Sequence, residues 1–304
     1  MIDNLDVVTG AFGYIGRYIA AQLLENGRQV KTITTHTEKP NPFGSHVQVF
    51  PYNFDEPERL EATLDGADTL FNTYWIRFEH SGMTYERAIA NTRILFNSAA
   101  KAGVKKIVHI SVTHAAKDSP LPYYAGKARQ EEALKESGLP YVIIRPTLVF
   151  GKEDILANNI AWLIRKFPFF PIAGDGQYRL QPIYVGDLAS IAVAQAQGKH
   201  SETIDAIGPE SYSFQEFAQT IASAIGKNVV FIRVPPWANI YLGKLIGLFI
   251  RDVILTRDEL RGLMGNYLTS EQPPNAPTIF SEWLKENHHT MGCAYSSELD
   301  RHFR

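Results

Sequence analysis

Residues 5–17 read LDVVTGAFGYIGR, and this segment is the strongest indication of the fold. It begins as a short run of β-forming residues and continues with glycines at positions 10, 13 and 16. Apolar residues then recur at helical spacing between Tyr14 and Glu25, as Ile15, Ile19 and Leu23. A second β-rich run follows at Val30–Thr35. The order of strand, glycine-rich turn, amphipathic helix and strand predicts a βαβ unit.

The three glycines have separate mechanical tasks in such a turn. Gly10 permits the sharp exit from the strand, Gly13 lets backbone N–H groups approach an anion, and Gly16 lets the helix pack against the strand. The amino end of the helix then faces the anion. The spacing G-x-x-G-x-x-G after a strand therefore predicts a site for the pyrophosphate of NAD or NADP. The predicted contacts from this turn are Gly10, Phe12, Gly13, Tyr14, Ile15, Gly16 and Arg17.

The end of the second strand bears on which cofactor is bound. NAD sites normally have an acidic residue there, which accepts the ribose hydroxyls. This chain has Thr34 and His36 instead, with Lys39 nearby and Arg17 just after the glycine-rich turn, and these groups could bind a 2′-phosphate. We therefore expect NADP or NAD, with NADP preferred; the alternative is that these are ordinary loop residues. Thr34, His36 and two residues after the third predicted strand, Asn53 and Phe54, complete the predicted cofactor-binding set.

Strands and helices continue to alternate along the first half of the chain. Further strands are predicted at 47–52, 69–73, 104–111 and 141–144, and helices at 57–64, 86–101 and 126–136. Strands that are apolar on both faces are typical of a parallel sheet covered by helices. We predict an α/β fold, a Rossmann-type doubly wound parallel sheet over residues 1–150, with a smaller, mostly helical C-terminal substrate domain over 151–304. Residues 182–208, with strands at 183–185 and 203–207, are expected to return to the main sheet.

Composition narrows the classes of partner. The chain has 304 residues, 45% of them hydrophobic, and a formal net charge of −2, so nucleic acid is not an expected partner. Its single cysteine, Cys293, cannot form an internal disulfide. Residues 1–4 show neither the basic residues nor the apolar core of a signal peptide, so a cytoplasmic location is expected. The motifs H-E-x-x-H and C-x-x-C are absent, and no metal site is predicted.

The most apolar segment lies in the C-terminal half, from Trp237 to Ile250. It is shorter than the roughly 20 residues that a membrane span needs. A buried helix of the second domain is the favoured interpretation. The alternative is a helix that lies on a membrane surface, which would make the protein membrane-peripheral. Peripheral membrane contact is thus open but not favoured.

Further motifs give the chain a family resemblance. The motif T-G-x-x-G-x-x-G lies at 9–16, and an asparagine, Asn91, lies in the predicted helix 86–101. Hydroxyl residues follow the fifth predicted strand, and the motif Y-x-x-x-K comes next, at Tyr123 and Lys127. R-P-x-x-V-x-G then occurs at 145–151 and V-x-D-L-A at 185–189. The chain resembles the extended, atypical branch of the short-chain dehydrogenase/reductase superfamily, most strongly from Leu5 to Gly151. Within this branch it is similar to the nucleotide-binding accessory subunit of respiratory complex I and to epimerase/dehydratase-like reductases.

The resemblance implies a set of catalytic residues, and their chemistry is consistent with it. Tyr123 and Lys127 lie one helical turn apart, so the Lys127 ammonium would favour ionisation of the phenol and hold the nicotinamide ribose. Tyr123 would then act as acid/base beside a moving hydride. Thr113, or less favourably Ser111, would orient the substrate oxygen, and Asn91 would support Lys127.

Two functions remain open on this basis. One is an NAD(P)-dependent oxidoreductase or epimerase that transfers hydride at a carbonyl or alcohol carbon of a small-molecule substrate. The other is a non-catalytic NADP(H)-binding sensor or assembly protein. Both require the glycine-rich turn, and they differ at Tyr123 and Lys127.

Departures from the family pattern restrict the substrate. Leu148 stands where sugar-nucleotide epimerases carry a substrate-binding Asn, and Leu180 stands where they carry an Arg, with Arg179 next to it. A nucleotide sugar is therefore not the expected substrate. The loop at 74–78, Tyr-Trp-Ile-Arg-Phe, indicates a flat or apolar substrate with one anionic group, or alternatively aromatic residues that pack beneath the second domain.

Overall fold

The computed structural model describes residues 4–302, and these divide into two compact units. The first unit contains the chain up to Pro146 together with Val185–Asp205. The second contains Thr147–Tyr184 and the chain from Ala206 onward.

The first unit is built on a seven-stranded sheet with the order β11-β6-β5-β4-β1-β2-β3. Every ladder from β3 to β6 is parallel. The strand order reverses between β1 and β4, which is the topological switch point where open α/β sheets bind ligands. The predicted α/β, Rossmann-type doubly wound sheet is confirmed. Its strands are β1 Leu5–Thr9, β2 Gln29–Thr34, β3 Val47–Pro51, β4 Thr69–Asn72, β5 Lys106–Ile110, β6 Tyr141–Pro146 and β11 Glu202–Ala206.

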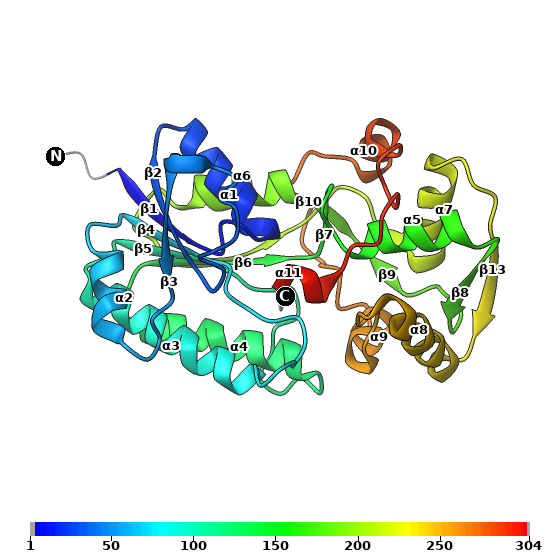
Figure 1. The fold of residues 1–304 in the computed structure, drawn as a ribbon, viewed down its shortest axis with the longest axis horizontal. Coiled ribbons are helices and arrows are strands. Elements are labelled where there is room, and N and C mark those ends of the chain that lie inside the picture. Colours follow the sequence, from blue (N-terminus) through cyan, green and yellow to red (C-terminus); the bar gives the residue numbers. More distant parts are fainter. Residues whose placement is uncertain (1–3, 303–304) are drawn as a thin grey trace. The chain divides into compact units, whose positions relative to one another are not determined.

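Helices cover both faces of this sheet (Figure 1). On one face, α1 (Tyr14–Glu25) buries Ile19 and Leu23 and packs beside α6 (Val185–Gln195). The Gln22 side chain fixes this pair by donating to the Gly186 carbonyl at 3.0 Å. The other face carries α2 (Pro57–Leu64), α3 (Tyr85–Lys101) and α4 (Pro122–Glu136). A short 3₁₀ turn, η1 (Gly44–His46), precedes β3.

The second unit combines helices with three short two-stranded ladders. The ladders pair β7 (Leu148–Phe150) with β10 (Pro182–Tyr184), β9 (Arg179–Leu180) with β12 (Tyr212–Ser213), and β8 (Phe169–Ala173) with β13 (Val230–Val234). Its helices are α5 Leu156–Lys166, α7 Phe214–Ala224, α8 Pro236–Ile250, α9 Arg257–Met264, α10 Phe280–Asn287 and α11 Glu298–His302. The aromatic rings of Phe150, Phe217 and Phe280 meet at the centre of its core.

Two local predictions need correction. Of the segment 182–208, only β11 joins the main sheet, because β10 pairs with β7 instead. The helix predicted at Trp237–Ile250 is present as α8, but it is not buried: Trp237 is 66% exposed and Phe249 is 82% exposed. Apolar composition predicted burial, yet these side chains of α8 face outward from the second unit. Among residues 4–302, no helix is both long and apolar enough to cross a bilayer.

Candidate functional site

The glycine-rich turn has a backbone path that depends on its glycines. Gly10 has a φ of +66°, and its N–H donates to the Ile33 carbonyl on β2 at 2.8 Å. Gly13 donates to the Gly10 carbonyl at 2.8 Å, which closes the turn. A Cβ atom at Gly16 would lie 2.3 Å from the Gly10 carbonyl oxygen, so any side chain there would push α1 away from the turn.

The amino end of α1 has no side chain that could take the place of an anion. Gly13 is its N-cap and offers no side-chain acceptor, and the first turn contains no acidic residue. A Cβ at Gly13 would lie 3.1 Å from the Gly10 carbonyl oxygen, so a side chain at residue 13 would be a tight fit against the turn. This cradle fits a pyrophosphate, which helix N–H groups and the helix dipole attract.

Buried polar side chains that the sequence analysis did not single out join the strand ends below the turn. The Thr9 hydroxyl donates to Asn72 Oδ1 at 3.1 Å and accepts from the Thr73 N–H at 2.7 Å. Asn72 Nδ2 in turn lies 3.0 Å from Nδ1 of His109, so β1, β4 and β5 are linked at the switch point. Burial and the charge of Lys127 hold the pKa of His109 well below its usual range. Thr9, Asn72 and His109 are polar residues in otherwise apolar strands, and this feature of the sequence could have indicated the network.

The end of β2 carries no carboxylate, as the sequence indicated. Thr34 is buried, and its hydroxyl accepts the His36 N–H at 3.1 Å, so it shapes the loop. Thr35 is exposed and His36 is partly buried. On α1, Arg17 directs a guanidinium N–H towards the Phe12 carbonyl at 3.4 Å, beside the turn.

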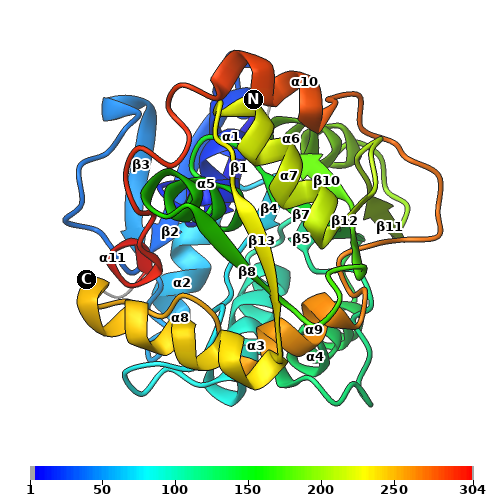
Figure 2. The same ribbon diagram turned by 90° about the vertical axis from the view of Figure 1, so that its right-hand side faces the viewer.

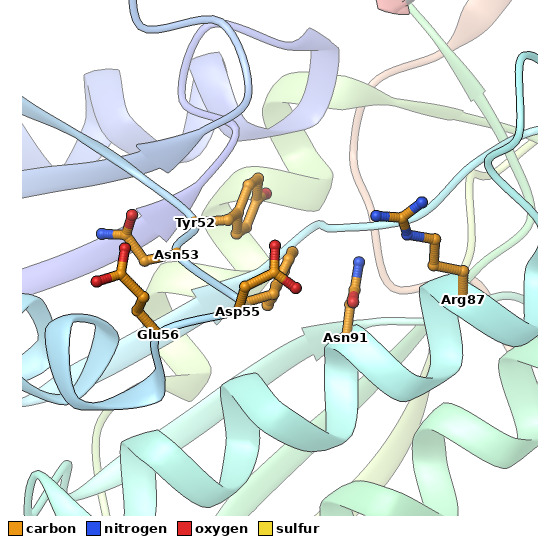
Figure 3. Close-up of a pocket in the computed structure, with 7 residues that line it drawn as sticks. Tyr52, Asn53, Asp55, Glu56, Arg87 and Asn91 are labelled. Carbon is orange, nitrogen blue, oxygen red and sulfur yellow. The ribbon is translucent and has the colours of Figure 1, made fainter.

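A pocket of about 330 Å³ opens between the segment after β3 and helix α3 (Figure 3). It brings together three predicted site residues, Asn53, Phe54 and Asn91. Asn53 adopts a left-handed conformation with φ +47°, which turns the chain at the end of β3. Phe54 stacks on Tyr52 with ring centroids 4.8 Å apart. The other lining residues carry no motif that predicted them; they are Tyr52, Asp55, Glu56 and Arg87.

Tyr123 and Lys127 occupy the first two turns of α4. Lys127 is only 3% exposed, and its ammonium donates to the Ile110 carbonyl at the end of β5, at 2.8 Å. Burial lowers the pKa of Lys127 to about 7, although the nearby Glu131 acts to raise it. Tyr123 is partly exposed. The pair therefore combines a reachable phenol with a buried, easily deprotonated amine.

Trp75, from the loop after β4, packs against this pair. The Lys127 Nζ lies 5.1 Å from its ring centroid, and the Tyr123 ring meets it edge-on at 6.0 Å. The indole fits because residue 126 is glycine: a Cβ there would lie 2.7 Å from the Trp75 ring. Tyr85 also stacks on the indole, at 5.5 Å. The glycine immediately before Lys127 was the sequence signal for this arrangement.

Two hydroxyl groups follow β5, and their surroundings differ. The Ser111 hydroxyl donates to Glu131 at 2.5 Å, and Arg145 also binds Glu131, at 2.5 and 2.9 Å. Ser111 therefore belongs to a buried ion-pair network. Thr113 is 1% exposed, and its hydroxyl lies 3.4 Å from the Pro146 carbonyl. Of the two hydroxyls, Ser111 is thus the one tied to a carboxylate.

Asn91 has a different partner from the predicted one. Its amide donates to the Tyr74 hydroxyl at 2.8 Å, whereas it was expected to support Lys127. Tyr74 is buried, and its ring packs against Tyr52 and Phe54 at 4.9 and 5.4 Å. Part of the aromatic loop after β4 therefore contributes to the core of the first unit.

The two positions that depart from the epimerase pattern lie in the second unit. Leu180 is fully buried in its core, and the Arg179 guanidinium binds Ser211 at 3.0 and 3.1 Å. Leu148 begins β7.

Comparisons with known proteins agree with this geometry. Residues 10–156 match the family described as NAD(P)H-binding. Over 240 residues the chain is 27% identical to the Arabidopsis thaliana protein named NADH dehydrogenase [ubiquinone] 1 alpha subcomplex subunit 9, mitochondrial, covering 75% of this chain and 60% of that one. The chain thus spans about three fifths of that relative's length.

Solved structures share the fold. Citrobacter sp. triphenylmethane reductase complexed with NADP(H) superposes with a TM-score of 0.76 at 20% identity, over 92% of this chain and 99% of that one. A nucleoside-diphosphate-sugar epimerase from Staphylococcus aureus gives 0.74 at 18% identity, over 92% and 99%. Residues 10–156 thus match the NAD(P)H-binding family, and the chain shares its Rossmann-type fold with a reductase and an epimerase.

Proposed function

We propose that this chain is an NADP(H)-preferring oxidoreductase that reduces a carbonyl group, or oxidises the corresponding alcohol, with Tyr123 as acid/base. The observation that carries the proposal is the placement of Tyr123 and Lys127 on the first turns of α4, with the Lys127 ammonium on the Ile110 carbonyl at the carboxyl end of β5. The glycine-rich turn after β1 lies at the same edge of the parallel sheet, where α/β folds bind their ligands.

The turn and the strand ends would hold the cofactor. The backbone of residues 12–17 would bind the pyrophosphate, and Asn53 and Phe54 would border the adenosine end. The missing carboxylate after β2, together with His36, Lys39 and Arg17, supports a preference for a 2′-phosphate. Bound NADPH supplies the hydride, and the chain's own residues orient the substrate and move the proton.

The proton step falls to Tyr123. Its hydroxyl would donate to a carbonyl oxygen that the Thr113 hydroxyl orients, and Lys127 would restore the phenol's proton or stabilise its anion. Trp75, Tyr85 and Tyr123 form an aromatic wall at this place, with ring centroids 5.5 to 6.4 Å apart. Such a wall favours a flat, apolar carbonyl compound, such as an aromatic aldehyde, a ketone or a quinone, over a nucleotide sugar.

A second candidate function is NADP(H) binding without turnover. The observation that favours it is the enclosure of Lys127, which is 3% exposed and has the Trp75 ring centroid 5.1 Å from its Nζ, so little room is left for a substrate beside the amine. The relative from Arabidopsis is named as a subunit of a dehydrogenase complex, which fits a binding role as well as a catalytic one.

The test compares wild type with Tyr123→Phe on a panel of aldehydes, ketones and quinones, with NADPH oxidation followed by absorbance. Loss of the phenolic proton should lower the rate by about 10²–10⁴, the usual size of a general-acid contribution. Affinity for NADPH should stay within about twofold, because the lost hydroxyl is not needed to bind the pyrophosphate.

Tyr124→Phe is the matched control. Tyr124 is the neighbouring tyrosine on α4, is buried, and has the wrong spacing from Lys127, so its variant should keep the wild-type rate. Equal rates for Tyr123→Phe and wild type would remove Tyr123 from the mechanism. Tight NADPH binding with no turnover of any substrate by wild type would select the non-catalytic function.

A further inference from the structure

Exposed apolar side chains are concentrated in one region of the second unit. Among residues 4–302, all large hydrophobic residues that are exposed fall between positions 167 and 249. They come from α8, from β13 and from the segment at the start of β8. The set is Phe167, Phe169, Val230, Ile232, Trp237, Tyr241, Leu242, Leu245, Leu248 and Phe249. We call this set the α8–β13 surface.

Helix α8 exposes most of its large apolar side chains, whereas a surface helix usually buries them. Ile240 and Gly247 face the core of the unit, whereas Trp237, Tyr241 and Leu248 follow one another on the outer side. These three are 66, 62 and 77% exposed. Positions spaced by four and seven residues share one side of a helix, so they form a continuous apolar stripe.

The ladder of β8 and β13 extends the surface. Phe170 and Phe231 point into the core, while their neighbours Phe169, Val230 and Ile232 are 50, 66 and 45% exposed. Val230 pairs with Phe169 in the register of the ladder, so the exposed side chains of the two strands are neighbours. Figure 2 shows β13 and α8 together on the side that faces the viewer.

The charge of this region indicates what covers it. Residues 227–251 contain four cationic residues, Lys227, Arg233, Lys244 and Arg251, and no Asp or Glu. Lys244 stands on the exposed side of α8, within the apolar stripe, and Arg233 is exposed on β13. The whole chain has a net charge of −2, so the positive charge of this segment contrasts with the slightly negative charge of the chain.

We propose that the α8–β13 surface docks the protein on an anionic lipid bilayer. Trp, Tyr, Phe and Leu beside Lys and Arg are the composition of helices that lie in the interface of a membrane, where the rings enter the boundary layer and the cations reach the headgroups. α8 has 15 residues, too few to span, which agrees with a helix lying parallel to the bilayer. Cations that stand within the apolar stripe itself, as Lys244 does, match a bilayer, where anionic headgroups border the apolar layer.

The test is cosedimentation of the full-length protein with vesicles of phosphatidylcholine alone and of phosphatidylcholine mixed with phosphatidylserine. We expect binding to the anionic vesicles that weakens as salt is added. Trp237 serves as an internal probe, because it is 66% exposed, whereas Trp75 and Trp162 are partly buried and Trp283 is buried. Its fluorescence should shift to the blue on binding, and Trp237→Phe should remove most of that shift.

Two variants separate the apolar and ionic contributions. Leu248→Asp combined with Phe249→Asp changes two side chains that are 77 and 82% exposed, so the fold should be retained. Vesicle affinity should fall by about tenfold or more, because two side chains no longer leave water. Lys244→Glu should weaken binding to the anionic vesicles by about fivefold or more. Lys135→Glu, an exposed position on α4, is the control and should change neither.

Three results would overturn the proposal. The first is failure of the wild-type protein to bind either kind of vesicle. The second is unchanged vesicle binding by the Leu248→Asp, Phe249→Asp double variant. The third is self-association of the vesicle-free protein that the double variant abolishes, which would assign the surface to contact between copies of this chain.

Discussion

At the scale of single residues, Lys127 places an ionisable amine in a buried site. Its side chain is 3% exposed, and the Ile110 carbonyl is its hydrogen-bond acceptor. Removal from water disfavours the ammonium, so the pKa falls to about 7 from an ordinary value of 10.5. An amine that titrates near neutrality can pass a proton to a neighbouring phenol, which is the role proposed for it.

This pKa predicts a pH dependence of stability. Between about pH 7 and pH 10 the unfolded chain keeps the Lys127 proton while the folded protein has released it, so the free energy of unfolding rises with pH. Below about pH 7 both states are protonated, and the folded protein carries the full cost of a buried charge.

The measurement compares urea unfolding of wild type and Lys127→Met across this range. The stability of the variant relative to wild type should be greatest near pH 6.5 and should decline by about 1.4 kcal/mol per pH unit above pH 7. The same variant should bind NADPH more weakly. A stability difference that does not change with pH would contradict the lowered pKa of Lys127.

At the scale of elements, the connection between β1 and α1 requires glycine for steric reasons. The contact between Gly16 and the Gly10 carbonyl sets how closely the helix approaches the turn. A Cβ added at residue 16 would lie only 2.3 Å from that carbonyl oxygen, which leaves no room for a side chain. The same closeness brings the amino end of α1 to the edge of the sheet where the pyrophosphate is proposed to bind.

Gly16→Ala should therefore destabilise the protein by about 1–3 kcal/mol, because the backbone must shift to accept one methyl group. Gly243→Ala is a matched control on α8, where nothing lies within 4 Å of the added Cβ. That variant should stabilise by up to about 1 kcal/mol through helix propensity. Thermal and urea unfolding measure both, and a neutral Gly16→Ala would show that α1 is not held by this contact.

Elements of the first unit were largely predictable because each carries its own local signal. The spacing of Ile15, Ile19 and Leu23 indicated α1, and the strands are largely apolar. The pairing of strands could not be predicted in this way. The sequence of β10 is as apolar as that of a main-sheet strand, and only the tertiary structure shows that β10 pairs with β7.

The candidate site was predictable to the same partial degree. Motif positions such as Tyr123 and Lys127 are close in sequence and share a helix. The approach of Trp75 to Lys127 and the bond from Asn91 to Tyr74 depend on side chains from separate elements, and no sequence spacing reports them. Burial of α8 was inferred from composition, which cannot tell a core helix from one that presents its apolar side outward.

At the scale of the whole molecule, the two units have different surfaces. The first carries the glycine-rich turn, the Tyr123–Lys127 pair and the pocket beside Asn53, and among its described residues no large hydrophobic side chain is exposed. The second carries the whole α8–β13 surface. The proposed cofactor chemistry and the proposed membrane docking thus involve residues of separate units, so variants made to test one should leave the other unchanged.

The central claim is that the turn at residues 10–16 binds NADP(H), and isothermal titration of the purified protein with NADPH and NADH tests it most directly. Wild type should bind one cofactor per chain, NADPH about tenfold or more tighter than NADH. Gly13→Asp should keep cooperative unfolding, since Asp is a favoured N-cap, yet lose binding, because its carboxylate takes the helix N–H groups and repels the pyrophosphate. Asn26→Asp, at the other end of α1, adds the same charge and should bind as wild type does. Undiminished binding by Gly13→Asp, or no binding of either cofactor by wild type, would contradict the account.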